Sequence, residues 1–223
     1  DVGYTYDANG NLTTLTDGAG GAGGATHVYD ALNRLTARTH AGRTVAYQYN
    51  QSGQPTAIQS WNQGTVGYTY DAAGQLATLQ DLGGASTTYA YRSSGALKQQ
   101  TLPGGVTSSL GYDTAGRLTS LDHRQGSTAI QTINYTLDNV GNRQTMTDAS
   151  GTTTYAYDPA NRLTQATYPA GGANGMPSGA VSYTYDAVGN RLTAGTQTLT
   201  YDASDRISSP GYTYNTNVNL IAK

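Results

Sequence analysis

The sequence predicts an all-β protein built from repeated antiparallel β-hairpins. Three observations lead to this prediction. The ten-residue phrase YTYDANGNLT at residues 4–13 returns as YTYDAAGQLA at 68–77 and as YTYDAVGNRLT at 183–193. The second aromatic residue of the phrase recurs with a period of about 21 residues through most of the chain. No stretch shows the 3.6-residue periodicity of an amphipathic helix.

Each repeat has the local properties of a hairpin. The consensus is Tyr-x-Tyr-Asp-x-x-Gly-x-Leu-Thr, in which Tyr-x-Tyr places two rings on one face of a strand. Tyrosine and threonine both favour strands. Asp-x-x-Gly suits a type I turn, and a glycine with positive φ then forms the bulge of a three-residue hairpin loop. Asn33 and Asn161 replace this glycine in two units, and asparagine is the residue next most able to adopt that conformation.

The hairpin predicts which residues face one another across the two strands. In the first unit we expect Asp7 to face Asn11, Tyr6 to face Leu12 and Thr5 to face Thr13. Cross-strand aromatic–aliphatic pairs contribute about 0.2–1 kcal/mol each. The same offset of six recurs as Tyr29/Leu35, Tyr70/Leu76, Tyr91/Leu97, Tyr112/Leu118, Tyr157/Leu163, Tyr201/Ile207 and Tyr214/Leu220.

On the opposite face of the hairpins, three pairs of opposite charge are expected to form ion pairs. These are Asp30/Arg34, Asp113/Arg117 and Asp158/Arg162.

Three units depart from this pattern. Tyr49 would face Pro55, and a proline in a strand favours an edge strand or a bulge. Leu137 and Tyr185 would face Arg143 and Arg191, which both lie in a Gly-Asn-Arg variant of the turn. We expect the loop to shift by one residue in these two units.

Stacked hairpins stabilise one another by burying a shared face. We therefore expect residues 1–223 to form one continuous β-array with ladders of tyrosine and leucine, as a segment of a much larger protein. We expect a further strand at TAIQTIN (128–134) and glycine-rich loops between the units. The structural residues of the array are expected to be Tyr6, Asp7, Gly10, Leu12, Tyr29, Asp30, Leu35, Tyr70, Asp71, Gly74, Leu76, Tyr112, Asp113, Gly116, Leu118, Tyr157, Asp158, Leu163, Tyr185, Asp186 and Gly189.

Composition excludes several classes of function. The formal net charge is −2, so the chain has no excess of basic residues to attract nucleic acid. No cysteine is present, which rules out disulfides and thiolate metal sites. No apolar run approaches the roughly 20 residues that span a membrane as a helix, so we expect no membrane insertion by this segment.

The motifs that suggest catalysis or cofactor binding are weak. Gly18, Gly20 and Gly23 match G-x-G-x-x-G, but a strand rather than a helix is expected to follow, so a flexible hairpin loop is the better interpretation. The histidines at 27, 40 and 123 are scattered, and the glutamate of an EF-hand is missing because the chain has no glutamate. No G-x-S-x-G motif occurs. We expect no catalytic residue, no metal site and no cofactor.

One side chain stands out as a candidate contact with a ligand. Trp61 is the single tryptophan and lies in the loop sequence SWNQG. Its alternative role is to anchor that loop. The tyrosine rows can likewise stack on sugars if they are exposed, but with so few aliphatic residues we expect them to serve as packing between hairpins.

The repeated phrases resemble a known family. YTYDANGNLT, VYDALNRLT, GYDTAGRLT, YAYDPANRLT and YTYDAVGNRLT are similar to the YD repeats of the Rhs family. That family includes bacterial Rhs polymorphic toxins, wall-associated bacterial proteins, the C component of Tc toxins, and animal teneurins. The resemblance implies a spiralling β-sheet that wraps into a hollow shell, which in the toxins encloses a C-terminal effector.

The chain also departs from the family at one motif. The family toxins end the shell with a core motif containing Asp-Pro-Gly, which carries an aspartate-dependent self-cleavage. Here Asp158-Pro159 is followed by Ala160 inside an ordinary repeat. No protease residue is therefore carried over from the resemblance.

The expected function is structural and non-catalytic. The resemblance implies a scaffold or shell-wall segment of a large secreted or cell-surface bacterial protein, used for toxin encapsulation and delivery. Its partners would be the rest of its own chain and an enclosed effector. The alternative is a surface adhesin that recognises carbohydrate or a partner protein through its tyrosine-rich faces or the Trp61 loop.

Overall fold

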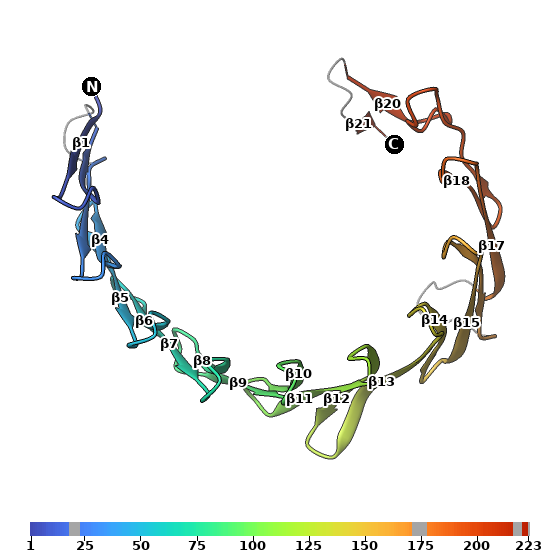
Figure 1. The fold of residues 1–223 in the computed structure, drawn as a ribbon, viewed down its shortest axis with the longest axis horizontal. Helices are drawn as coiled ribbons and strands as arrows, with labels where there is room; N and C mark the ends of the chain where they lie inside the picture. The colour runs from blue at the N-terminus through green and yellow to red at the C-terminus, as the bar shows by residue number, and fades with distance from the viewer. Residues whose placement is uncertain (18–22, 171–177, 216–219, 223) are drawn as a thin grey trace. The chain divides into compact units, whose positions relative to one another are not determined.

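The computed structural model describes residues 1–17, 23–170, 178–215 and 220–222. Every regular element in these ranges is a β-strand (Figure 1). The chain forms two compact units. The first comprises Asp1–Ser109 with Gln125–Ser127, and the second comprises Leu110–Arg124 with Thr128–Lys223. The all-β prediction is confirmed.

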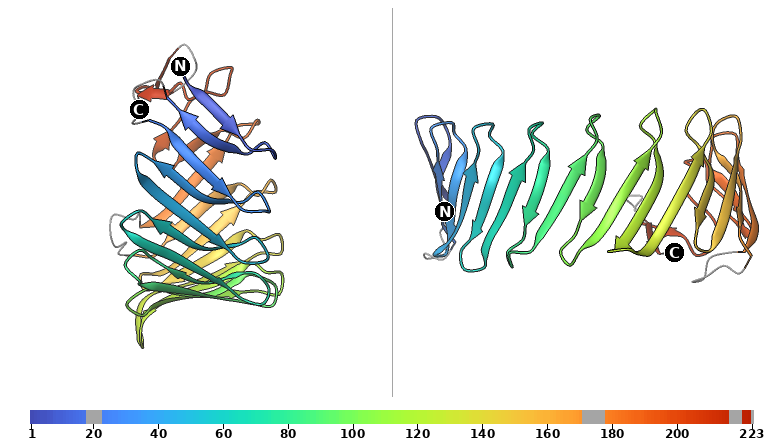
Figure 2. Two further views of the ribbon diagram at one scale, coloured as in Figure 1. Left: turned by 90° about the vertical axis from the view of Figure 1, so that its left-hand side faces the viewer. Right: turned by 90° about the horizontal axis from the view of Figure 1, so that it is seen from below.

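The first unit is a succession of antiparallel strands, each paired with the next one in the sequence. Figure 2 shows them side by side, with chain reversals at both ends. Its strands are β1 (Gly3–Tyr6), β2 (Leu12–Thr16), β3 (Ala25–Tyr29), β4 (Leu35–His40), β5 (Arg43–Tyr49), β6 (Pro55–Ser60), β7 (Gly64–Tyr70), β8 (Leu76–Gln80), β9 (Ser86–Tyr91) and β10 (Leu97–Thr101).

The second unit follows the same plan. Strands β11 (Val106–Tyr112) and β12 (Leu118–Gln125) contribute residues to both units. Antiparallel pairing continues from β13 to β19, and the last two strands form a separate two-stranded sheet. The remaining strands are β13 (Thr128–Leu137), β14 (Arg143–Asp148), β15 (Gly151–Tyr157), β16 (Leu163–Tyr168), β17 (Gly179–Tyr185), β18 (Arg191–Ala194), β19 (Gln197–Thr198), β20 (Thr213–Tyr214) and β21 (Leu220–Ala222).

The Asp-x-x-Gly phrases lie at chain reversals, as predicted. In the first hairpin the Asp7 N–H donates to the Asn11 carbonyl at 3.0 Å, and the Gly10 N–H donates to the Asp7 carbonyl at 3.1 Å. Gly10 has φ of 83°, while Asn33 and Asn161 adopt φ of 59° and 60° in the equivalent turns. The fourth turn residue must therefore be able to adopt positive φ.

The predicted facing of tyrosine and leucine is confirmed. Tyr6 faces Leu12 across the first hairpin. The same offset holds for Tyr29/Leu35, Tyr70/Leu76, Tyr91/Leu97, Tyr157/Leu163, Tyr201/Ile207 and Tyr214/Leu220. The turn between Tyr112 and Leu118 has the same two backbone hydrogen bonds.

The predicted pairing of Thr5 with Thr13 was wrong. Thr5 faces Thr14, because the register shifts between Thr5 and Tyr6. Thr13 is the extra residue of a second bulge, and its hydroxyl lies 2.9 Å from the Thr5 hydroxyl instead. The same shift recurs just before the second tyrosine of later hairpins, so each repeat contains a bulge beyond the turn itself.

The expectation for Pro55 is met in part. Tyr49 faces Pro55 with a bulge between Gln48 and Tyr49, which is one of the two expected outcomes. The other outcome is wrong, because β6 pairs with both β5 and β7 and is not an edge strand. Proline is tolerated there because it is the first residue of the strand.

The turns that precede Arg143 and Arg191 do not shift. Leu137 still faces Arg143 and Tyr185 still faces Arg191. The Asp138 N–H donates to the Asn142 carbonyl at 2.9 Å, as in the other hairpins. The Gly-Asn-Arg variant therefore replaces leucine with arginine and leaves the turn unchanged.

The described residues form β-sheet without an enclosed core of large apolar side chains. No large side chain among them is fully buried, and the buried apolar residues are only Ala25, Ala166 and Leu199. Tyr4 and Tyr6 are exposed, whereas the other tyrosines are half-buried. The rings therefore rest on the sheet rather than in an enclosed interior, and the expectation of buried rings is met only in part.

Gly116 offers a test of the turn geometry. Its φ is 78°, and a Cβ placed there would meet no atom within 4 Å. We expect Gly116→Ala to lower the free energy of unfolding by about 1–2 kcal/mol, through backbone strain alone. Gly116→Asn should cost less, because asparagine occupies this position in two other turns. Urea denaturation, monitored by circular dichroism, measures the free energy of unfolding of both variants. An equal loss of stability in the two variants would contradict the argument.

Candidate functional site

The side chains that could bind a metal ion do not cluster in the described residues. No group of three His, Cys, Asp or Glu side chains gathers there in a way that could hold a metal ion. Gly18 and Gly20 of the glycine motif lie outside the described ranges, and Gly23 is followed by strand β3. No helix in the described part is long and apolar enough to cross a membrane. The features that repeat along the chain are instead two ladders of hydrogen bonds.

The first ladder is formed by tyrosine hydroxyls. In the first unit the Tyr29 hydroxyl donates to the Leu12 carbonyl at 3.1 Å, so the ring of one hairpin is bonded to the backbone of the hairpin before it. The acceptor is the residue that faces the second aromatic of the preceding phrase, or that faces Leu137 in the one phrase where leucine replaces this aromatic. The same bond joins Tyr49 to Leu35, Tyr70 to Pro55, Tyr91 to Leu76, Tyr157 to Arg143, Tyr185 to Leu163 and Tyr201 to Arg191, at 2.8–3.0 Å.

This ladder accounts for an unusual feature of the composition. The chain has 19 tyrosines and no phenylalanine. Phenylalanine would cover the same apolar surface but could not donate to the carbonyl. The absence of phenylalanine was the signal in the sequence that the hydroxyl is used, although it does not reveal the acceptor.

The aspartate of each phrase closes its own turn. One Asp7 carboxylate oxygen accepts from the Asn9 N–H at 3.0 Å and the Asn11 N–H at 2.8 Å, while the other accepts from the Asn11 side chain at 2.9 Å. These bonds, with the Asn11 side chain as the largest cause, lower the pKa of Asp7. The backbone N–H of the fourth following residue has the largest effect in lowering the pKa of Asp30, Asp113 and Asp158.

The second ladder runs from turn to turn. The residue after the turn glycine, or after its substitute, carries a side-chain donor that reaches the next turn. Asn11 donates to the Asn33 side chain at 2.8 Å, and Arg34 donates to the Asn50 carbonyl at 3.1 Å. The other donor and acceptor residues are Gln54 and Gly74, Gln75 and Gly95, Arg117 and Asp138, Asn142 and Asn161, Arg162 and Asp186, and Asn190 and Asp205. Ala96 occupies this position in the fifth turn and has no donor to offer.

Where arginine occupies this position, it also forms an ion pair with the aspartate of its own turn. The three predicted Asp–Arg ion pairs are confirmed, each with an N–O distance of 2.7 Å. A fourth, Asp202–Arg206 at 2.6 Å, was missed because Asp205 rather than glycine or asparagine holds the positive φ. The Arg34 guanidinium also lies 4.8 Å from the centre of the Tyr49 ring, which links the two ladders.

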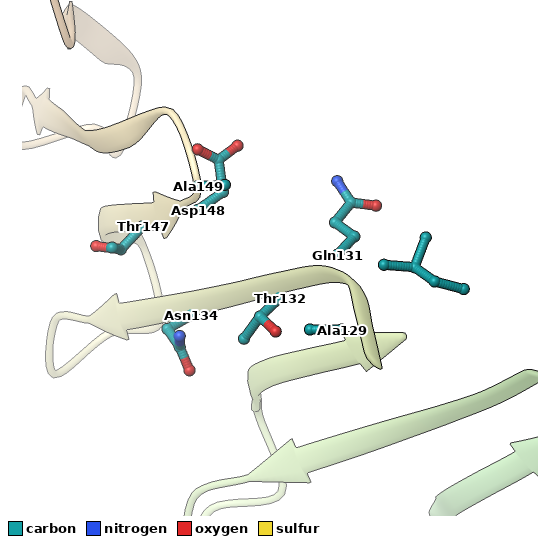
Figure 3. A pocket seen from close by; sticks show the side chains of 8 residues that line it. Ala129, Gln131, Thr132, Asn134, Thr147, Asp148 and Ala149 are labelled. Atoms are coloured by element: carbon teal, nitrogen blue, oxygen red, sulfur yellow. The ribbon is translucent and has the colours of Figure 1, made fainter. Parts of the chain in front are cut away.

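Two of the shallow hollows among the described residues of the second unit differ in their lining. One, of about 340 Å³, lies on the tyrosine face and is lined by Arg143, Tyr135 and Tyr155 among others. The second, of about 330 Å³, lies beside β13 (Figure 3). Its lining combines hydroxyl and amide groups, such as Thr132 and Asn134, with the Asp148 carboxylate.

Trp61 lies in the turn between β6 and β7, and 53% of its surface is exposed. The Arg43 guanidinium lies 5.2 Å from the centre of its ring. Together with Thr44, Gln59 and Ser60 it lines a hollow of about 220 Å³. The indole therefore presents surface to solvent while one cation stacks on it.

Comparison with known proteins identifies the family and related folds. The Teneurin YD-shell family model matches residues 1–80 and 57–172, which together make up well over half of the chain. The chain belongs to this YD-shell family. No curated protein matches the sequence.

Several solved structures have a similar fold. The crystal structure of TcdB2-TccC3 aligns with 98% of this chain at a TM-score of 0.69 and 16% identity. The Photorhabdus luminescens Tc holotoxin pore aligns with 99% at a TM-score of 0.67 and 18% identity. The chain covers only 16% and 14% of those two proteins. At this identity the likeness shows the fold alone.

Removing one tyrosine hydroxyl tests the first ladder. Tyr70→Phe deletes the donor to the Pro55 carbonyl, a 2.8 Å bond, and keeps the ring. We expect the free energy of unfolding to fall by about 0.5–1.5 kcal/mol, measured by urea denaturation. Tyr4→Phe is the matched control, since Tyr4 is 56% exposed on the first strand. If the two variants lose the same stability, the hydroxyl ladder contributes nothing.

Acid should weaken the turns. A carboxylate whose folded pKa is lowered stabilises the fold above its unfolded pKa of about 3.9, and this contribution disappears as pH falls through the lower, folded pKa. We therefore expect the melting temperature to fall as pH decreases below about 4. Asp158→Asn should flatten that dependence, because the pKa of Asp158 is among those lowered. Thermal denaturation across this range checks the prediction, and a melting temperature that rises on acidification would contradict it.

Proposed function

We propose that this chain is a wall segment of a hollow shell in a larger secreted or cell-surface bacterial protein, and that its role is structural rather than catalytic. The shell would enclose a C-terminal effector and deliver it. Membership of the YD-shell family supports the architecture. The similar fold of the Tc toxin structures supports the connection with toxins.

The two ladders are the observation that carries this proposal. Each hairpin is bonded to the next one through a tyrosine hydroxyl on its face and a polar side chain at its turn, as Tyr70 and Gln54 illustrate. Because every unit repeats these contacts, the sheet can be lengthened by adding units. It needs no buried core to hold it together, and a thin wall that encloses a volume requires both properties.

The wall would be inert by composition. Charged residues make up 12% of the chain, and the net charge is −2. Threonine pairs such as Thr39 with Thr44 and Thr136 with Thr145 bond to each other at 2.7 Å. Satisfied hydroxyls and low charge offer an enclosed or passing polypeptide few strong attachment points.

Electron microscopy of the full-length parent protein tests the shell. We expect a closed β-sheet wall around an internal volume that contains density for the C-terminal region. An extended array of hairpins without an enclosed volume would overturn the proposal. Deleting the C-terminal region should empty the interior and leave the wall in place.

A surface adhesin is the second candidate, favoured by the exposure of Trp61. An indole that is 53% exposed beside the Thr44, Gln59 and Ser60 side chains offers an apolar ring and hydrogen-bonding groups to a sugar. A glycan array that compares the chain with Trp61→Ala distinguishes the two candidates. Binding that this substitution abolishes would support a carbohydrate-binding adhesin. Binding to no glycan, or binding that the substitution leaves unchanged, would contradict it.

A further inference from the structure

Arg143 occupies a position that leucine holds in most repeats. It faces Leu137 across its hairpin, where Leu12 faces Tyr6 in the first. Its guanidinium lies over the ring of Tyr135, 4.3 Å from the centre, and 5.9 Å from the centre of the Tyr155 ring. Two aromatic rings from neighbouring hairpins therefore hold the charge on the tyrosine face.

This guanidinium has no partner of opposite charge within the part of the chain that the structure describes. Arg117 and Arg162 stand one residue closer to their turns and form ion pairs with Asp113 and Asp158. At the Arg143 hairpin the Asp138 carboxylate is bonded instead to Asn142, at 3.0 Å. The one-residue difference thus places Arg143 on the other face of the strand, away from the aspartate of its own turn.

The surroundings limit what can bind there. The hollow of about 340 Å³ beside Arg143 is lined by the three leucines at 118, 137 and 163, by the tyrosines at 135, 155 and 157, and by Gly141. No carboxylate or amide side chain contributes to this lining. The site therefore offers guanidinium N–H donors next to apolar surface.

We propose that this hollow binds a carboxylate of an acidic polypeptide segment, an aspartate or glutamate side chain with an apolar residue beside it. The guanidinium fork matches a carboxylate, and Arg–carboxylate hydrogen bonds are charge-assisted. The leucines would cover the adjacent apolar side chain. A sugar fits less well, because Arg143 already covers the tyrosine faces on which a sugar would stack and because the amide and carboxylate groups that pair with hydroxyls are missing. This proposal does not depend on the shell function.

The test measures peptide binding to the intact 223-residue chain by fluorescence anisotropy. The probe is a dye-labelled peptide in which leucine alternates with aspartate, and its control carries asparagine in place of aspartate. We expect the aspartate peptide to bind more tightly, and Arg143→Leu to weaken that binding about tenfold. Binding should also weaken as sodium chloride is raised from about 50 to about 300 mM.

Arg143→Leu is suited to this test because leucine occupies the same position in most other hairpins, so the fold should be retained and circular dichroism verifies that it is. Arg117→Gln is the matched control, since Arg117 is paired with Asp113, and it should leave binding unchanged. Equal binding of the two peptides, or equal losses in the two variants, would overturn the proposal. Displacement of the peptide by glucuronate as readily as by unlabelled peptide would assign the site to acidic sugars and overturn it as well.

Discussion

The hydrogen bond from a tyrosine hydroxyl to the backbone of the preceding hairpin is the side-chain interaction that reinforces the pairing between successive hairpins throughout this structure. Isolated two-stranded hairpins are marginally stable in water, and the described residues contain no large side chain that is fully buried. The units therefore depend on contacts with their neighbours, which are the backbone pairing between successive hairpins and the tyrosine hydroxyl bonds. A phenol provides both the apolar surface that covers the neighbouring hairpin and a donor, as Tyr29 does toward Leu12. Phenylalanine would provide only the surface.

The turns add a second connection that tolerates variation in sequence. Asp7 and its equivalents accept from the N–H groups of their own turn. The side chain after the turn glycine donates to the same aspartate and also to the next turn, as Asn11 does. Asparagine, glutamine and arginine can each occupy that position, because each side chain is long enough to place an N–H donor at the following turn. Asn11, Gln54 and Arg162 form this hydrogen bond. The acceptor is a backbone carbonyl or a short side-chain oxygen. Repeats can therefore differ in sequence at this position and still make the bond from turn to turn.

Much of this fold could be predicted from the sequence because the turn is determined locally. Asp-x-x-Gly specifies a reversal within four residues, and the six-residue offset then places Tyr6 against Leu12. The bulge at Thr13 could not be predicted, since the same offset is compatible with either register beyond it. At Pro55 the bulge was predicted but the alternative of an edge strand was wrong, because proline is tolerated as the first residue of a paired strand. The hydroxyl acceptors were missed because they belong to a different hairpin, and spacing within one repeat does not indicate them. The assignment to a shell came from the resemblance rather than from the geometry of a hairpin.

The central claim is that the hydroxyls are bonded between hairpins, and exchange of the tyrosine hydroxyl protons, measured residue by residue by NMR, tests it most directly. The account predicts slow exchange for Tyr29, Tyr49, Tyr70, Tyr91, Tyr157, Tyr185 and Tyr201, whose hydroxyls donate to carbonyls. It predicts fast exchange for the exposed Tyr4 and Tyr6. Uniformly fast exchange across all of these residues would show that the hydroxyls are not bonded to the neighbouring hairpin, and this would contradict the account.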